Sequence, residues 1–265
     1  MKSSRVISYK EIQPEKVWAL EYVNLQTLIS NDKNNESKVL VSFIFDDGYS
    51  SVYDVVFPLF EKYDIVGDVA IVGSYLNKKG YLTSEQVKEL IEVGWSLGDH
   101  TFTHPDMNLI DLDRLDKEIK LNQYFIKKLF NYELLYFVFP KSKVKNKHLS
   151  FVLNKYICAF TGESYIIANS PPYRGLLKRT QVSIYEIFKS SILGRNFIKE
   201  LIKNIYASTH FPTQRWFILF THNVSKTPGI FDTPLKHFIN LIRNLTTMEN
   251  VKIISIKNVL SGELE

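Results

Sequence analysis

Two aspartates and two histidines have the types and spacing of a metal-binding hydrolytic site. Asp46 and Asp47 come directly after a strongly apolar segment. His100 and His104 are four residues apart, and on a helical turn this spacing directs both imidazoles the same way. Two histidine nitrogens and one carboxylate are a common ligand set for a catalytic divalent cation. The pattern therefore predicts metal-dependent hydrolysis, in which one aspartate binds the ion and its neighbour removes a proton from water.

Each of these features also has a structural interpretation. A histidine pair at this spacing often lies capped or buried in a core, and an aspartate after a strand often caps the next helix. His222 follows another apolar segment, where a lone histidine is more often structural than catalytic. Its significance comes from the other two clusters, because amide hydrolysis needs a proton donor for the departing amine. Histidine suits that task near neutral pH.

The three polar clusters each follow a segment with the character of a buried strand. We expect strands at residues 39–45, 66–72, 95–97, 134–139, 156–160, 216–220 and 251–256. We expect helices at 51–63, 111–130, 147–154, 185–206 and 235–245, and one that begins near Thr83 and ends at Gly94. Residues 161–182 look irregular. The alternation predicts a parallel α/β fold, either a barrel or a doubly wound sheet, and in a barrel the clusters would meet at the carboxyl ends of the strands.

Four short motifs resemble, in order, those of the NodB-homology polysaccharide deacetylases, carbohydrate esterase family four. They are FDDGY at residues 45–49, LGDHTFTHPDM at 97–107, FVFP at 137–140 and ILFTH at 218–222. The resemblance covers most of the chain from about residue 39, and the first two motifs together are specific. It implies an α/β fold, a distorted and incomplete (β/α) barrel of the polysaccharide deacetylase type.

The resemblance also implies a role for each residue that matches a motif. Asp46 matches the catalytic base and His222 the catalytic acid. The metal ligands would be Asp47, His100 and His104, with Zn²⁺ as the expected ion and Co²⁺ as an alternative. The implied reaction is attack of activated water on the acyl carbonyl, with the ion and a backbone N–H stabilising the oxyanion.

The third and fourth motifs depart from the family pattern. The third commonly carries an arginine early and a Tyr-Gly pair at its end, whereas here Pro140 is followed by Lys141. We expect Lys141 or Arg174 to restore a cation near the base, and we assign Pro140, Lys141 and Arg174 to substrate binding. The fourth motif is not recognisable around residues 158–162. These departures concern substrate choice and the tuning of Asp46, and they leave the predicted metal ligands intact.

The motifs favour a hydrolase that removes an N-acetyl or similar small acyl group from a sugar, in glycan or glycolipid biosynthesis. A second hypothesis keeps the site but changes the acyl group, giving a deformylase of a lipid- or nucleotide-linked amino sugar. A third is a catalytically silent carbohydrate-binding domain, which the two degraded motifs favour slightly. Metal content separates the third from the others, because a silent module has little reason to retain a stoichiometric ion.

Composition sets the broad class and the partners. The chain has 265 residues, a single cysteine and a net charge of +5 without a dense basic block, so we expect no disulfide and no nucleic-acid partner. No run of about 18 apolar residues predicts a transmembrane helix. We expect a cytoplasmic protein, with peripheral contact at the inner membrane surface as an option. We assign residues 1–38 to an N-terminal extension packed on the barrel and 39–265 to the deacetylase-like catalytic domain.

Overall fold

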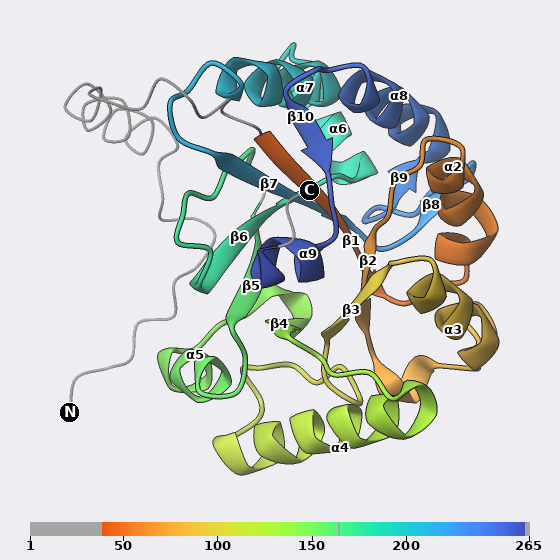
Figure 1. The fold of residues 1–265 in the computed structure, drawn as a ribbon, viewed down its shortest axis with the longest axis vertical. Helices are drawn as coiled ribbons and strands as arrows, with labels where there is room; N and C mark the ends of the chain where they lie inside the picture. The colour runs from red at the N-terminus through yellow and green to blue at the C-terminus, as the bar shows by residue number, and fades with distance from the viewer. Residues whose placement is uncertain (1–38, 164, 263–265) are drawn as a thin grey trace. The chain divides into compact units, whose positions relative to one another are not determined.

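Seven parallel strands form a closed ring in the computed structural model, which describes residues 39–163 and 165–262 (Figure 1). Consecutive strands pair in chain order, and a pairing of β1 with β7 closes the ring. The strands are β1 Val39–Asp47, β2 Asp68–Ile71, β3 Ser96–Asp99, β4 Tyr136–Val138, β5 Cys158–Glu163, β6 Gly175–Gln181 and β7 Arg215–Thr221. The predicted (β/α) barrel is confirmed, and the prediction for residues 1–38 lies outside the described residues.

The barrel is distorted at one edge of β1. The strand β10, Val251–Ile253, pairs with residues 39–41 of β1, while β2 pairs with residues 44–47 of the same strand. One edge of β1 is therefore shared between two neighbours, and β10 stands outside the ring. A short separate pairing joins β8, Val224–Ser225, to β9, Thr233–Pro234.

Helices surround the ring on its outer side (Figure 1). They are η1 Val52–Val56, α2 Phe57–Glu61, α3 Ser84–Glu92, α4 Leu112–Phe130, α5 Asn146–Leu153, α6 Ile184–Ile192, α7 Phe197–Ser208 and α8 Leu235–Thr246. Two single turns, η2 Gly73–Tyr75 and η3 Pro140–Ser142, follow β2 and β4, and the short α9, Ile256–Ser261, follows β10. Among the described residues, no helix is long and apolar enough to cross a membrane.

Two hydrophobic cores follow from the alternation of side chains along strands buried on both faces. In β1, Phe43 and Phe45 point outward and pack against Phe60 and Phe238 of the surrounding helices. The alternate residue Ile44 points inward. The inward side chains fill the barrel: Leu40, Ile44, Tyr136, Val138, Cys158, Phe160, Leu177, Trp216, Ile218 and Phe220. The interior is therefore packed, and only the ends of the barrel are available for chemistry.

Three predicted elements differ from the observed ones. Residues 161–182 are not irregular, because β5 extends to Glu163 and β6 occupies Gly175–Gln181. The β6 sequence, GLLKRTQ, lacks the β-branched apolar run that marks buried strands, and only its pairing with β5 and β7 defines it. The single helix expected at 185–206 is two helices, and Gly194 takes a positive φ of 68° in the turn between them. The segment expected as a strand to 256 ends at Ile253, and α9 begins at Ile256.

A buried carboxyl group, Asp68, joins α9 to the amino-terminal end of the barrel. The backbone N–H of Ile256 donates to Asp68 Oδ1 at 2.9 Å, and the hydroxyl of Ser96 donates to the same oxygen. Asp68 is fully buried. Burial disfavours the charged form and raises the pKa of Asp68 to about 7, although both hydrogen bonds oppose this shift.

Asp68→Asn should make stability less dependent on pH. Because the pKa of Asp68 is raised in the folded state, the carboxyl group favours folding at low pH. That contribution is lost as pH rises from about 4 to about 7. The free energy of unfolding of the variant, measured by denaturant titration, should therefore rise relative to that of wild type across this window. Above it, the difference between the two proteins should stay constant. Asp54→Asn, an exposed change on η1, is the control. Parallel pH profiles for wild type and Asp68→Asn would contradict the assignment.

Candidate active site

The predicted site residues meet at the carboxyl end of the barrel. Asp46 and Asp47 are the last residues of β1, and His222 directly follows β7. His100 directly follows β3, and His104 lies four residues further along the same loop. Because the strands are parallel, their carboxyl ends share one face of the ring, and the fold brings three distant segments together there.

Asp47, His100 and His104 form a compact set of potential metal ligands. One donor atom from each residue lies within 4.8 Å of the others. The Nε2 atoms of His100 and His104 are 3.6 and 3.4 Å from Asp47 Oδ1. That carboxylate oxygen is buried and has no hydrogen-bond partner among the described residues. A buried oxygen without a donor, facing two ring nitrogens, fits a divalent cation bound between them.

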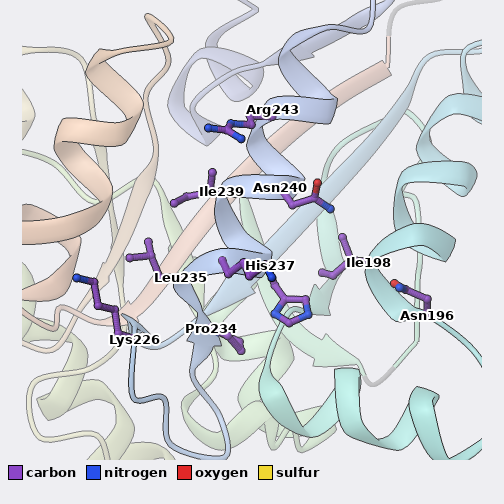
Figure 2. A pocket seen from close by; sticks show the side chains of 10 residues that line it. Asn196, Ile198, Lys226, Pro234, Leu235, His237, Ile239, Asn240 and Arg243 are labelled. Carbon is purple, nitrogen blue, oxygen red and sulfur yellow. The ribbon is translucent and has the colours of Figure 1, made fainter.

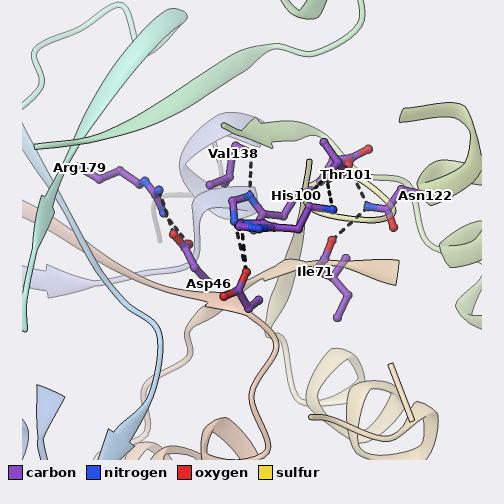
Figure 3. Close-up of polar contacts among 10 residues, drawn as sticks. Asp46, Ile71, His100, Thr101, Asn122, Val138 and Arg179 are labelled. Carbon is purple, nitrogen blue, oxygen red and sulfur yellow. Dashed lines mark hydrogen bonds and ion pairs between the residues drawn. The ribbon is translucent and has the colours of Figure 1, made fainter. Parts of the chain in front are cut away.

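The protonation of the histidines also fits a cation. His100 Nδ1 lies 2.8 Å from the Val138 carbonyl oxygen, which can only accept, so Nδ1 carries the proton and Nε2 keeps its lone pair (Figure 3). Burial lowers the pKa of His100 to about 3, although Asp46 opposes the shift. Burial also lowers the pKa of His104. Both rings are therefore neutral at neutral pH, as metal ligands must be.

The loop that carries the two histidines is held by a buried hydrogen-bond network. Asp99 Oδ1 accepts from the backbone N–H of Thr101 and from the side chain of Asn122, both at 2.8 Å. The other oxygen of Asp99 accepts from the hydroxyl of Tyr156. Asn122 lies on α4 and also donates to the Ile71 carbonyl (Figure 3). The network ties the loop to β2, α4 and the segment before β5, so the histidines are fixed by tertiary contacts.

A second contact from α4 and a strained backbone complete the loop. Glu118 accepts from both the backbone N–H and the hydroxyl of Thr103, each at 2.7 Å. Thr101 and His104 have φ values of 67° and 56°, and Asp47 has 71°. Residues other than glycine rarely take this left-handed conformation, which costs about 1 kcal/mol or more and occurs preferentially at functional sites. The left-handed backbone at these three residues therefore directs their side chains at the cost of local strain.

Asp46 is held in its ionised form by Arg179 of β6. The guanidinium donates from Nη1 to Oδ1 at 2.6 Å and from Nη2 to Oδ2 at 3.1 Å (Figure 3). Both side chains are buried, and Arg179 stacks on the ring of Phe220 at 4.1 Å. Burial acts to raise the pKa of Asp46, but the charge and hydrogen bond of Arg179, together with the nearby imidazoles of His100 and His222, outweigh it, so the pKa lies below its ordinary value. Asp46 can therefore accept a proton at neutral pH.

The cation beside Asp46 is neither of the two that the sequence predicted. Arg174 is exposed and precedes β6, at the amino end of that strand, whereas Asp46 lies near the carboxyl end of β1. Arg179, and not Arg174, is therefore the cation beside Asp46, and the assignment of Arg174 to substrate binding stays a prediction. Alternation places Leu177 and Arg179 on the same inward face, so recognising residues 175–181 as a strand would have identified Arg179.

Lys141 and Pro140 remain close to the metal-ligand set. Pro140 is buried and opens the turn η3, directly after β4. Lys141 Nζ is 3.7 Å from Asp106 Oδ2. The pKa of His104 is lowered mainly by burial and also by the charge of Lys141, while the nearby carboxylates oppose both effects. The assignment of these two residues to substrate binding stays a prediction.

His222 lies between aromatic rings at the same end of the barrel. Its ring centroid is 6.3 Å from that of Phe220 and 6.1 Å from that of Phe231. Phe45 of β1 pairs with Thr221 of β7, so the next residues, Asp46 and His222, lie at the same level of neighbouring strands. Its Nδ1 is buried and has no hydrogen-bond partner among the described residues.

Comparison with known proteins confirms the family resemblance. The family model for polysaccharide deacetylases matches residues 33–156. The protein YxkH of Bacillus subtilis strain 168, whose name places it among the polysaccharide deacetylases, is 26% identical over 122 residues, or 46% of this chain and 43% of that protein. The matches span less than half the length of the curated relatives. The matched segment contains Asp46, Asp47, His100 and His104, whereas His222 lies beyond it.

Solved structures share the barrel. A Streptococcus pyogenes deacetylase, PplD, solved in complex with acetate, is 25% identical, with a TM-score of 0.50 over 64% of this chain and 72% of that one. A CE4 family pseudoenzyme from Bacillus anthracis, at 14% identity, gives a TM-score of 0.55 over 85% of this chain and 66% of that one. The second likeness concerns the fold alone.

The site should bind one Zn²⁺ per chain. His104→Gln should reduce the affinity at least tenfold, because one of three ligands is lost. Calorimetric titration with Zn²⁺ and elemental analysis of the dialysed protein would measure this. His210→Gln, a change of an exposed histidine, should bind as wild type does. Equal binding by His104→Gln and His210→Gln would rule out the site.

Arg179→Gln should destabilise the protein by about 3–5 kcal/mol, because it leaves the buried carboxylate of Asp46 without its partner. Arg174→Gln, five residues earlier, should leave the denaturation midpoint unchanged. The double change Asp46→Asn with Arg179→Gln should recover part of the loss. Similar effects of the two single arginine changes would contradict the placement of β6.

Proposed function

We propose that this chain, which resembles the polysaccharide deacetylases in sequence and fold, is a metal-dependent hydrolase acting on a sugar amide. It would remove an acetyl or similar small acyl group from the sugar nitrogen, in glycan or glycolipid assembly in the cytoplasm. The observation that carries the proposal is the convergence of two neutral histidines, an unpaired carboxylate oxygen and an ionised aspartate at one end of the barrel.

The residues at the site divide into a group that holds the ion and a group that moves protons. Asp47, His100 and His104 would hold a divalent ion, either Zn²⁺ or Co²⁺. When bound, such an ion supplies Lewis acidity toward the acyl oxygen and lowers the pKa of water. Asp46 would accept the proton of the attacking water, because each of its oxygens keeps a lone pair beyond its bond to Arg179.

His222 would serve as the proton donor to the departing amine. Amide cleavage requires protonation of the nitrogen, and the side chain must stand near the reacting bond without holding the ion. His222 stands close enough to Asp46 and Asp47 to influence both carboxyl groups. The aromatic rings of Phe220 and Phe231, with centroids 6.3 and 6.1 Å from that of His222, limit its movement.

A cluster of three partly exposed tyrosines beside the site supports a sugar substrate. Tyr49 and Tyr81 stack with ring centroids 4.9 Å apart, and Tyr75 packs on Tyr81 at 4.8 Å. Tyr75 also lies 6.3 Å from His104, which joins the cluster to the proposed metal site. Aromatic surfaces with polar edges commonly line ligand sites, where they contact the apolar faces of a ligand and its hydroxyls together. The acetate in the Streptococcus pyogenes relative is the product that N-deacetylation would release.

Activity should be tested on N-acetylated and N-formylated sugars with metal-loaded protein, by measuring released acetate and formate. Release should stop after chelation and return with Zn²⁺ or Co²⁺. Preferential formate release would favour the deformylase hypothesis. Absence of a stoichiometric ion together with no release from any sugar amide, lipid-linked ones included, would indicate a silent module. Full activity in protein shown to be free of metal would mean that the mechanism is wrong.

Asp46 and Asp47 should separate into two roles. Asp46→Asn should keep one ion per chain while turnover falls by about 10²–10⁴, because a general base is lost without loss of a ligand. Asp47→Asn should lose the ion, and excess metal should restore part of the activity. Metal content and rate, measured on the same preparations, distinguish these outcomes, with Asp54→Asn as the control. Loss of the ion from Asp46→Asn and its retention by Asp47→Asn would reverse the assignment.

A further inference from the structure

An exposed set of large apolar side chains, here called the apolar ridge, runs along α6 to the loop before β9. Its members and exposed fractions are Tyr185 42%, Phe188 64%, Ile192 70%, Leu193 64%, Ile230 58% and Phe231 55%. Scattered apolar residues on a surface need no explanation, but a contiguous group of this size usually marks an interaction surface.

The apolar ridge is continuous because of its helical spacing and its backbone contacts. Tyr185, Phe188 and Ile192 follow one another at three and four residues along α6, so they share its outer face. The backbone N–H of Tyr185 donates to the Ile230 carbonyl at 3.1 Å, which joins the loop to the start of the helix. Phe231 then extends the ridge to the ring of His222, so the ridge borders the proposed active site.

Basic side chains outnumber acidic ones around the apolar ridge. Lys189, Arg195 and Lys199 are exposed between residues 183 and 199. The carboxylate in that stretch, Glu186, is buried at 2% exposure. Two further carboxylates adjoin the ridge, since Glu200 Oε1 lies 3.9 Å from Arg195 Nε and Asp232 directly follows Phe231. The border of the ridge therefore carries charges of both signs, with basic residues in the majority.

A basic groove is lined by residues that follow the ridge closely in the chain, Asn196 after Leu193 and Pro234 after Phe231 (Figure 2). It has a volume of about 770 Å³ and is formed by the first residues of α7, by α8 and by the loop after β8. Figure 2 shows His237 in the middle of the lining, with Asn196 on one side and Lys226 on the other. Lys236 and Arg243 complete a lining whose titratable groups are all bases. Such a groove suits a phosphate-bearing ligand.

From these observations we infer that the apolar ridge and the basic groove together bind the surface of an anionic phospholipid bilayer. The apolar side chains enter the boundary between headgroups and acyl chains, and the adjacent bases contact lipid phosphates.

This binding mode gives the proposed enzyme a substrate class. Because Phe231 belongs to the apolar ridge and packs on His222, docking places the active site next to the membrane surface. The substrate would then be an acylated sugar attached to a lipid, with its sugar in the site and its lipid in the bilayer. This last step depends on the proposed function, whereas the membrane contact itself does not.

Vesicle flotation tests the membrane contact directly. The full chain should float with vesicles of phosphatidylglycerol and phosphatidylcholine, and bind vesicles of phosphatidylcholine alone at least tenfold less. Phe188→Asp with Ile192→Asp should reduce binding to anionic vesicles at least tenfold. Lys236→Glu and Arg243→Glu should each reduce it about fivefold or more, since one basic residue near an anionic surface contributes about 1 kcal/mol. The matched controls on the exposed face of α4, Leu121→Asp and Lys117→Glu, should bind as wild type does.

Several results would overturn the inference. Equal vesicle binding by the double variant Phe188→Asp with Ile192→Asp and by Leu121→Asp would exclude the apolar ridge as a membrane contact. If the chain does not bind vesicles but forms a dimer that only the α6 changes dissociate, the ridge is a contact with a second copy. Competition by millimolar inorganic phosphate, with no effect of the α6 changes, would indicate a site for a soluble phosphate. Phe188→Asp should release acetate from a soluble sugar at the wild-type rate. If it does so without binding vesicles, membrane docking has failed while the proposed chemistry is intact.

Discussion

The pairing of β1 with β7 determines where every part of the site lies. It closes the ring, and closure of a parallel ring places the carboxyl ends of all seven strands on one face. The aspartates of β1, the histidines after β3, Arg179 of β6 and His222 after β7 are far apart in the sequence and meet only because of this closure. An open sheet with the same strands would separate β6 and β7 from β2 and β3, and the site would not form.

The site gathers several ionisable groups where burial disfavours their charged forms, and most of them are stabilised in a different way. Asp46 is stabilised by a bidentate guanidinium, and the imidazoles of His100 and His104 avoid the cost by remaining neutral. Asp47 is the exception, since burial raises its pKa and one of its oxygens has no donor among the described residues. A cation between Asp47 and the two rings would remove this imbalance, so the electrostatics and the geometry favour the same ligand.

The position of Arg179 shows that an interaction can be kept while the residue that makes it moves to another strand. The resemblance predicted an arginine near the end of β4, where this chain has Val138, Phe139 and Pro140. Arg179 reaches Asp46 from β6 across the packed interior, supported by the ring of Phe220. Its presence weakens the case for a silent module, because the missing arginine was one of the two departures on which that hypothesis rested.

The fold class, most strands and helices, and the residues that converge could be predicted from the sequence, because apolar alternation and short contiguous motifs are local properties of the chain. Asp46, Asp47, His100 and His104 could be identified in this way since each pair lies within one loop or strand end. The placement of Arg179, and not Arg174, beside Asp46 could not be predicted, since a strand with mixed polar and apolar residues is defined by the strands that pair with it. The tautomer of His100 and the exposure of the α6 face were likewise decided by contacts between distant segments, which local patterns do not encode.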